Sequence, residues 1–228
     1  MQVSALTELA DEVASCRLCP RLVEWREEAA AKPPARCVGE RYWARPLPGF
    51  GDAGARVLIV GLAPAAHGGN RTGRLFTGDR SGDFLFASLH RTGFANQATS
   101  IAAFDGLTLN GAYITAVVRC APPDNKPTPL ERAACLPYLV REIGLLTELR
   151  VVIALGSFAW DGALRAIGDR GFRASVKPVF GHLAEARIGP YVLLGSYHPS
   201  QQNTFTGRLT PPMLDEVMIR ARDLAGRG

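Results

Sequence analysis

Apolar runs of strand length alternate with amphipathic segments along most of the chain. The continuous apolar runs cover residues 56–61, 112–118, 150–155 and 191–195, as in parallel strands that are buried on both faces. Helical patterns cover residues 5–14, 21–31, 83–91, 129–146, 157–167 and 211–224. Ser81 and Thr128 are candidate N-caps for two of these helices. The alternation predicts a three-layer α/β/α fold with a central, mainly parallel, four-stranded sheet.

The segment before the first strand is rich in proline and glycine. Residues 32–54 contain too many helix and strand breakers to form regular structure. They also contain Tyr42, Trp43 and Phe50, so we expect this segment to pack against the rest of the chain. The 228 residues show no repeat or low-complexity tract. We therefore expect one domain, residues 1–228, with a cysteine-bearing segment at its N-terminal end.

Composition and charge narrow the location and the partners. The sequence has neither a run of about twenty apolar residues nor the basic and apolar pattern of a signal peptide. We expect a cytoplasmic monomer with no membrane association. The net charge of +5 favours a polyanionic partner, although many enzymes carry such a charge.

Four of the five cysteines are spaced as two pairs. Cys16 and Cys19 form a C-x-x-C motif, Cys120 follows the second predicted strand, and Cys135 lies in the next helix. In a chain without an export signal this spacing indicates a metal site. Four thiolates suit zinc and a [4Fe–4S] cluster equally well. Cys37, isolated in a loop, is expected to be an ordinary buried residue.

Three polar segments directly follow predicted strands. We call residues 61–82 the first loop, 119–128 the second loop and 196–209 the third loop. The carboxyl ends of parallel strands are where α/β folds place their active sites. The first loop is rich in glycine, which lets backbone approach a ligand, but it matches no P-loop or dinucleotide motif. In the third loop, His198 stands where a histidine can donate a hydrogen bond to a developing anion.

These segments together resemble a known family. Residues 42–52, the first and second loops, the His198-Pro-Ser sequence and the cysteine spacing are similar to the uracil-DNA glycosylase superfamily, most closely family 5 (type b). The resemblance covers nearly the whole chain. It implies an α/β fold and hydrolysis of the bond between uracil and the sugar in DNA. It also implies a structural [4Fe–4S] cluster held by Cys16, Cys19, Cys120 and Cys135.

The resemblance also implies catalytic roles. His198 would stabilise the departing base, and Asn125 would position the attacking water. Asp79 is a second candidate, for the water or for the sugar cation. From residue type alone, a turn residue is a competing interpretation for Asn125 and a helix-entry acid for Asp79.

Candidate base and DNA contacts lie in the first and third loops, and the role of Phe76 follows from the same resemblance. Phe76 would stack on the flipped base, and the surrounding contacts would come from Gly61, Leu62, Ala63 and Pro64. The candidate DNA-binding residues are Arg71, Ser200, Gln201, Arg208 and Leu209. Leu209 is the candidate wedge that fills the space left by the flipped nucleotide, and a partly buried loop leucine is the competing interpretation.

Departures from related families bear on specificity. Related enzymes have polar side chains where this chain has Leu62, Ala63 and Ala116. Apolar positions discriminate weakly between bases, so we expect hypoxanthine and xanthine to be accepted beside uracil. The first and third loops contain no lysine, which predicts a monofunctional enzyme that leaves an abasic site.

Two other functions fit parts of the sequence. A non-catalytic nucleic-acid-binding module with structural zinc would use the same charge, aromatic residues and cysteines. It would not need His198 or the glycine-rich first loop. A hydrolase of free nucleosides would share the fold, but it would need neither the arginine-rich loops nor the four-cysteine site.

Overall fold

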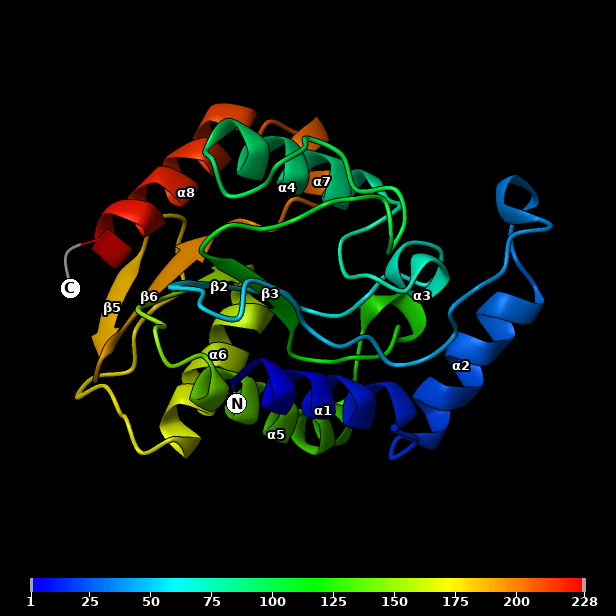
Figure 1. Ribbon diagram of the computed structural model, residues 1–228, viewed down its shortest axis with the longest axis horizontal. Helices are drawn as coiled ribbons and strands as arrows, with labels where there is room; N and C mark the ends of the chain where they lie inside the picture. Colours follow the sequence, from blue (N-terminus) through cyan, green and yellow to red (C-terminus); the bar gives the residue numbers. More distant parts are fainter. Residues whose placement is uncertain (1, 227–228) are drawn as a thin grey trace.

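The computed structural model describes residues 2–226, which form three layers around one mixed sheet (Figure 1). The sheet has six strands in the order β1-β3-β2-β4-β6-β5. Their bounds are β1 Phe50–Gly51, β2 Val57–Gly61, β3 Ala112–Ala116, β4 Val151–Leu155, β5 Glu185–Ile188 and β6 Tyr191–Ser196. The four predicted strands are the parallel centre, β3-β2-β4-β6.

The expectation of four strands was wrong at the two edges of the sheet. There β1 pairs antiparallel with β3, and β5 pairs antiparallel with β6. Strand β1 has only two residues and β5 is partly exposed. Neither gives the long apolar run by which a buried strand is identified in a sequence.

Within residues 2–226, six long α-helices and two short ones surround the sheet. They are α1 Gln2–Ser15, α2 Pro20–Ala31, α3 Gly69–Thr72, α4 Arg80–Arg91, α5 Pro129–Leu145, α6 Ser157–Asp169, α7 Gln201–Phe205 and α8 Pro211–Gly226. The predicted cap Thr128 is confirmed, because it forms a capping box with Glu131. The cap of α4 is Asp79 and not Ser81: its Oδ1 accepts from the Gly82 amide at 2.9 Å.

The two faces of the sheet are covered by different helices. Helices α4 and α8 lie over one face, and α5 and α6 lie over the other, with α1 packed against α5 (Figure 1). Alternate residues of the parallel strands point to opposite sides, so Ile59 and Ile153 face α4 and α8. Val60 and Val152 belong to the core beside α5 and α6. Burial on both faces explains why these strands are continuously apolar.

The strand order creates a crevice at the carboxyl ends of the parallel strands. From β2 the chain moves to β3 on one side, and from β3 it crosses to β4 on the other side of β2. Ligands bind in α/β folds outside the carboxyl ends of the strands at such a reversal. The first, second and third loops follow β2, β3 and β6. Within residues 2–226, no helix combines the length and apolarity that crossing a membrane requires.

Candidate active site

A cleft at the carboxyl edge of the sheet contains most of the predicted site residues. It consists of an inner hollow of about 520 Å³ and an outer hollow of about 920 Å³. The two hollows share Ala65, Asp79, Arg80, Asn125 and Gln201. The rest of the inner hollow is lined by Leu62, Ala63, Pro64, Leu75, Phe76, Ser81, His198, Ser200 and Gln202. The size and the mainly apolar walls suit a small flat ligand.

Phe76 occupies the inner hollow in a strained backbone conformation. Its φ is +53°, which is an outlier for a bulky side chain. Two glycines hold it there. A Cβ on Gly61 would lie 2.7 Å from the Phe76 ring, and a Cβ on Gly82 would lie 1.8 Å from the Phe76 carbonyl oxygen. Gly61 therefore lies behind the ring, outside the residues that line the inner hollow. Strain that is fixed from several sides is typical of functional positions.

His198 faces Phe76 across the inner hollow. The two ring centroids are 6.1 Å apart, with 34° between the ring planes. Burial lowers the pKa of His198 to about 4. The imidazole is therefore neutral at neutral pH and presents one N–H donor and one nitrogen acceptor. Its backbone carbonyl accepts from Asn203 Nδ2 at 2.9 Å, which ties the start of the third loop to α7.

Asp79 borders both hollows and also caps α4. Its Oδ1 accepts from the Gly82 amide, while its Oδ2 lies where a Cβ on Gly68 would be only 2.3 Å away. Burial raises the pKa of Asp79, although backbone amides of Gly82 and Ser81 favour the ionised form. One oxygen is therefore structural, and the carboxylate as a whole sits at the cleft. Asp79 is therefore both the N-cap of α4, as the helix-entry interpretation expected, and a residue that lines the cleft.

Asn125 lies on the second loop, on the border between the two hollows. Both Asp124 and Asn125 have positive φ values, +53° and +55°. Asparagine and aspartate adopt this left-handed conformation more readily than other non-glycine residues. The two residues turn the loop, so the turn-residue interpretation of Asn125 also applies. The exposed Asn125 side chain borders the cleft.

The predicted DNA-binding residues fall into different environments. Ser200 caps α7 by accepting from the Asn203 amide, and Gln201 is exposed beside the cleft. Arg208 is exposed, with its guanidinium 4.6 Å from the Tyr197 ring centroid. These three positions are accessible to a large ligand.

Arg71, in contrast, is engaged within the protein. Its Nε donates to the His67 carbonyl at 2.8 Å, and its Nη2 donates to the Gly78 carbonyl at 3.1 Å. Its Nη1 forms an ion pair with Glu40. Arg71 therefore connects two parts of the first loop to each other and to Glu40, and it also lines the outer hollow.

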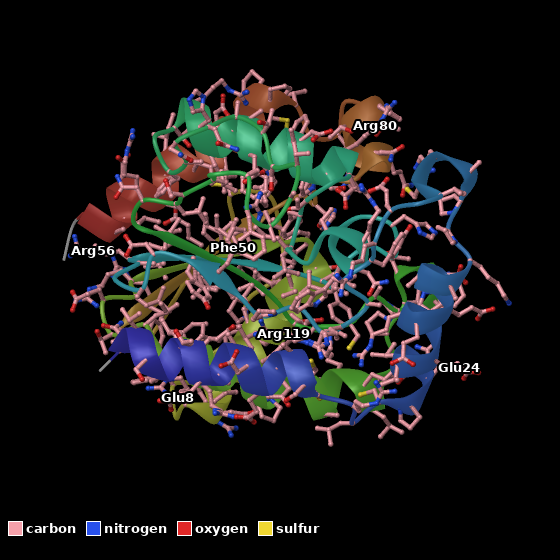
Figure 2. All side chains as sticks on the ribbon, turned by 45° about the vertical axis from the view of Figure 1, so that its right-hand side comes forward. Glu8, Glu24, Phe50, Arg56, Arg80 and Arg119 are labelled. Atoms are coloured by element: carbon pink, nitrogen blue, oxygen red, sulfur yellow. The ribbon has the colours of Figure 1, made fainter. Side chains whose placement is uncertain are left out.

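Leu209 does not lie on the surface. Its side chain is 0% exposed and belongs to the core with Leu214 and Phe86. A side chain buried in this way cannot enter DNA in this conformation, so Leu209 is corrected from a wedge to a core residue. The exposed apolar residue of the third loop is Phe205, 67% exposed, which lines the outer hollow. Arg80 lies beside α7 (Figure 2), with its guanidinium 5.3 Å from the Phe205 ring centroid.

The four predicted metal ligands come together in a second pocket. Cys16 follows α1, Cys19 precedes α2, Cys120 follows β3, and Cys135 lies in α5. All four line one pocket. Cys37 is buried elsewhere, beside Tyr42, as its isolated position suggested.

A buried arginine lies against these cysteines. Arg26 is 1% exposed, and its Nη1 is 3.0 Å from Cys120 Sγ. Within the part of the chain that the structure describes, no carboxylate forms an ion pair with Arg26, and its Nε has no hydrogen-bond partner. The other fully buried arginine, Arg119, is paired with Glu142. A buried cation requires an anion nearby, so Arg26 indicates that this pocket is suited to a negatively charged group.

The thiols also fit a metal-bound group. Burial raises the pKa of Cys120 to about 11 and that of Cys135 to about 12. These thiols stay neutral by themselves, whereas a metal deprotonates its thiol ligands. Among residues 2–226 no three or more ligating side chains converge closely enough to hold a metal ion. A cluster of several irons and sulfides needs a wider spacing than a single ion does.

The cysteine pocket and the cleft are physically connected. Asn70, at 0% exposure in α3, donates from Nδ2 to the Arg26 carbonyl at 3.1 Å. The Ala44 amide donates to the Asn70 carbonyl at 3.0 Å. The Trp43 ring packs against Gly73. Residues 42–52 and α2 thus support the first loop from behind.

Comparison with known proteins gives a consistent result. The family model described as "Uracil DNA glycosylase superfamily" matches residues 48–222. The type-5 uracil-DNA glycosylase of Mycobacterium tuberculosis is 54% identical over 224 residues, 97% of this chain and 82% of that protein. The type-5 enzyme of Mycobacterium leprae is 53% identical over 224 residues, 97% of this chain and 96% of that protein. That of Thermus thermophilus is 53% identical over 215 residues, 94% and 95%.

Proposed function

The chain belongs to the uracil DNA glycosylase superfamily and, within it, to the type-5 uracil-DNA glycosylases, and from this we propose that its cleft removes uracil from DNA by hydrolysing the N-glycosidic bond. The observation that carries the proposal is the pair formed by Phe76 and His198. An aromatic ring on a strained backbone and a neutral imidazole lie 6.1 Å apart, centroid to centroid, in a hollow at the strand ends.

The inner hollow would receive the base after it leaves the duplex stack. An enzyme that acts on a glycosidic bond must extrude the nucleotide, at a cost of a few kcal/mol. Phe76 offers a ring face on which the base can stack. Leu62, Ala63 and Pro64 would enclose the base from the side of β2. The fixed backbone of Phe76 means that the stacking surface exists before DNA binds.

His198 would stabilise the departing base. Cleavage leaves negative charge on the uracil, and a hydrogen-bond donor aimed at the oxygen strengthens as that charge develops. The lowered pKa of His198 keeps the ring neutral, so it acts as a donor without carrying a positive charge. Closing the hollow against water increases the effect of this hydrogen bond.

Asn125 and Asp79 would act on the opposite side of the bond. The Asn125 amide, exposed at the border of the two hollows, would hold the attacking water. The Asp79 carboxylate at the same border would stabilise positive charge on the sugar. Its cap to Gly82 fixes its position, because one oxygen stays bound to the backbone.

The range of bases would extend beyond uracil. The side chains of Leu62 and Ala63 at the inner hollow are apolar, and Ala116 ends β3 without a polar group. A pocket with few specific hydrogen bonds rejects analogues weakly. Hypoxanthine and xanthine in DNA are therefore further substrates under this proposal.

DNA contacts would come from the rim of the cleft. Ser200, Gln201 and the exposed Arg208 would contact the DNA backbone, together with Arg71 and Arg80, which line the outer hollow. Phe205 replaces Leu209 as the wedge on the third loop. Lys32, Lys126 and Lys177 are absent from the residues that line either hollow, which favours a monofunctional enzyme that leaves an abasic site.

The cysteine pocket would hold a [4Fe–4S] cluster. Cys16, Cys19, Cys120 and Cys135 would be its ligands, with Arg26 as the neighbouring cation. When bound, such a group supplies a covalent crosslink between the N-terminal segment, β3 and α5. Arg26 and Asn70 then hold the first loop against that crosslink.

An alkali-cleavage assay tests the function. Purified protein is incubated with a labelled duplex that contains one uracil and a matched duplex that contains thymine. Strand cleavage that appears only after alkali, and only with uracil, is the expected result for a monofunctional glycosylase. Intact uracil strands in both duplex and single-stranded DNA would favour the binding-module alternative.

A further inference from the structure

The segment between α4 and β3 displays two large apolar side chains to solvent. Ile101 is 69% exposed, and Phe104 is 100% exposed. Ile101 lines the outer hollow together with Arg80 and Phe205. Single exposed apolar residues are common on protein surfaces. Here the loop that carries them, residues 100–105, is held by several hydrogen bonds and an ion pair.

Asp105 organises this loop from within. Its carboxylate accepts from the amides of Ile101 at 2.7 Å, Ala102 at 3.3 Å and Leu107 at 3.1 Å. It also forms an ion pair with Arg74 at 2.7 Å, and both side chains of this pair are largely buried. Arg74 donates further to the Ala103 carbonyl at 3.3 Å. The loop is thereby held in one conformation with its apolar residues outward.

The same contacts attach the loop to the base-stacking residue. Arg74 precedes Phe76 by two positions, and its Nη2 donates to Ser100 Oγ at 2.6 Å. The Gly78 amide donates to the Ser100 carbonyl at 3.3 Å, and Thr77 Oγ1 is 2.6 Å from Ser100 Oγ. Hydrogen bonds from residues on both sides of Phe76 in the sequence therefore tie the loop to the segment that carries the ring. The spacing between the stacking ring and the exposed apolar residues is set by the protein.

We propose that the loop of residues 100–105 is a second DNA-intruding element, in which Ile101 and Phe104 enter the duplex groove beside the extruded nucleotide. The proposal rests on the proposed function, because it takes duplex DNA with one flipped base as the occupant. Apolar side chains wedge between base steps in many proteins that distort DNA. A wedge that is already ordered loses little conformational entropy on binding, which accounts for the extensive anchoring by Arg74 and Asp105.

Continuity with the cleft favours DNA over a protein partner. Ile101 and Phe205 line the outer hollow from different loops, and that hollow opens into the inner one through Asp79, Arg80 and Asn125. A nucleotide in the inner hollow brings its neighbours in the strand to the outer hollow. Ile101 would then lie beside the base step from which the nucleotide has been extruded.

A wedge matters only where a base stack must be opened. Ile101→Ser, Phe104→Ser and the double variant are compared with wild type in single-turnover excision of uracil from a duplex and from the same strand alone. The double variant is expected to lose about tenfold or more on the duplex, roughly the effect of 1.4 kcal/mol, and to lose a clearly smaller factor on the single strand. The Phe104→Leu variant keeps an apolar side chain at this position, so its duplex rate should be closer to that of wild type than to that of Phe104→Ser.

A matched control separates this effect from a general loss of surface apolarity. Val179→Ser removes a residue that is 84% exposed on the segment between α6 and β5 and is not among the residues that line either hollow, and it should leave both rates unchanged. A fluorescent 2-aminopurine next to the uracil reports unstacking directly. Its signal on binding should fall in the double variant and not in Val179→Ser.

Two results would overturn the proposal. Equal rates for the double variant and wild type on the duplex would show that the loop does not enter DNA. Equal losses on duplex and single strand would assign the loop to folding or base binding, and the glycosylase function would stand in either case. Absence of excision by wild type from both substrates would instead remove the proposed function, and this proposal with it.

Discussion

The edge of the Phe76 ring lies against Gly61. A Cβ at position 61 would be 2.7 Å from Phe76 Cζ and 2.9 Å from Cε2. The last residue of β2 must therefore lack a side chain for the ring to keep its place in the inner hollow. The glycine at the end of β2 and the position of the proposed stacking ring are thus linked through one contact.

Gly61→Ala is expected to displace the Phe76 ring and lower the single-turnover rate of uracil excision by tenfold or more, where tenfold is about 1.4 kcal/mol. Phe76→Ala should lower it comparably, because it removes the stacking surface. In the double variant the two losses should not add, since the added methyl no longer meets a ring. Rates of the four proteins form a double-mutant cycle, and strictly additive losses would contradict the link.

His198→Ala is expected to lower the excision rate by about 10²–10³-fold, the usual effect of removing one donor to a developing anion. Binding to DNA that already contains an abasic site should change little, because no base is then present. His90→Ala, on the exposed side of α4, is the control for loss of a histidine. An unchanged rate for His198→Ala would remove the imidazole from the reaction.

The pH dependence follows from the lowered pKa of His198. The neutral imidazole persists down to about pH 4, so the excision rate should stay level from pH 8 to pH 5 as far as this group is concerned. The folded chain binds fewer protons than the unfolded chain between its pKa of about 4 and the ordinary value of about 6.5. The free energy of unfolding should therefore fall by up to about 3 kcal/mol as pH falls through that window.

Denaturant unfolding at several pH values measures this stability term, and His198→Asn should remove it. Burial raises the pKa of Asp79, so protonation of Asp79 also acts on the acid side of the rate profile. The pH–rate profile of Asp79→Asn shows whether the fall in rate at acid pH comes from protonation of Asp79 or of His198. A rate that rises as pH falls from 8 to 5 would indicate that the imidazolium is the working form.

Two substitutions separate the roles of Asp79. Asparagine caps helices about as well as aspartate, so Asp79→Asn should keep the thermal midpoint and lower the excision rate. Asp79→Ala should lose the rate and also about 1 kcal/mol of stability. Calorimetry and single-turnover kinetics on the same samples decide the matter. Full activity in Asp79→Asn would leave the residue with a capping role alone.

The cysteine pocket is tested by its metal content. Anaerobically purified protein is expected to be brown and to contain iron and acid-labile sulfide in equal amounts. Cys135→Ser should lose most of the iron. Cys37→Ser, the matched control outside the pocket, should keep it. Colourless protein with bound zinc would replace the cluster by a mononuclear site.

The sequence predicted those features that depend on local pattern. The continuous apolar runs around Ile59 and Ile153 identified the parallel strands, because strands covered on both faces have no polar side. Thr128 was a correct cap, because its capping box lies within four residues. The positions of these elements in the strand order then brought the three loops together.

Features that depend on distant contacts were missed. The burial of Leu209 follows from the packing of α8 against α4, which no local pattern reveals. The ion pair that Arg71 forms with Glu40, thirty-one residues earlier, likewise has no signal in the local sequence. Helix α7 has five residues and gives no periodicity that would have indicated Phe205. In each case the environment of the side chain is determined by residues that are distant in the sequence, and residue type alone does not reveal it.

The two short antiparallel edges of the sheet have a consequence for handling the protein. Strand β1 offers only two residues of open backbone, and β5 carries the charged side chains of Glu185 and Arg187. Long, flat, apolar edges are templates on which further chains add and aggregate. This sheet ends on both sides before such a template forms, so concentrated solutions should resist fibril growth even though the central strands are almost entirely apolar.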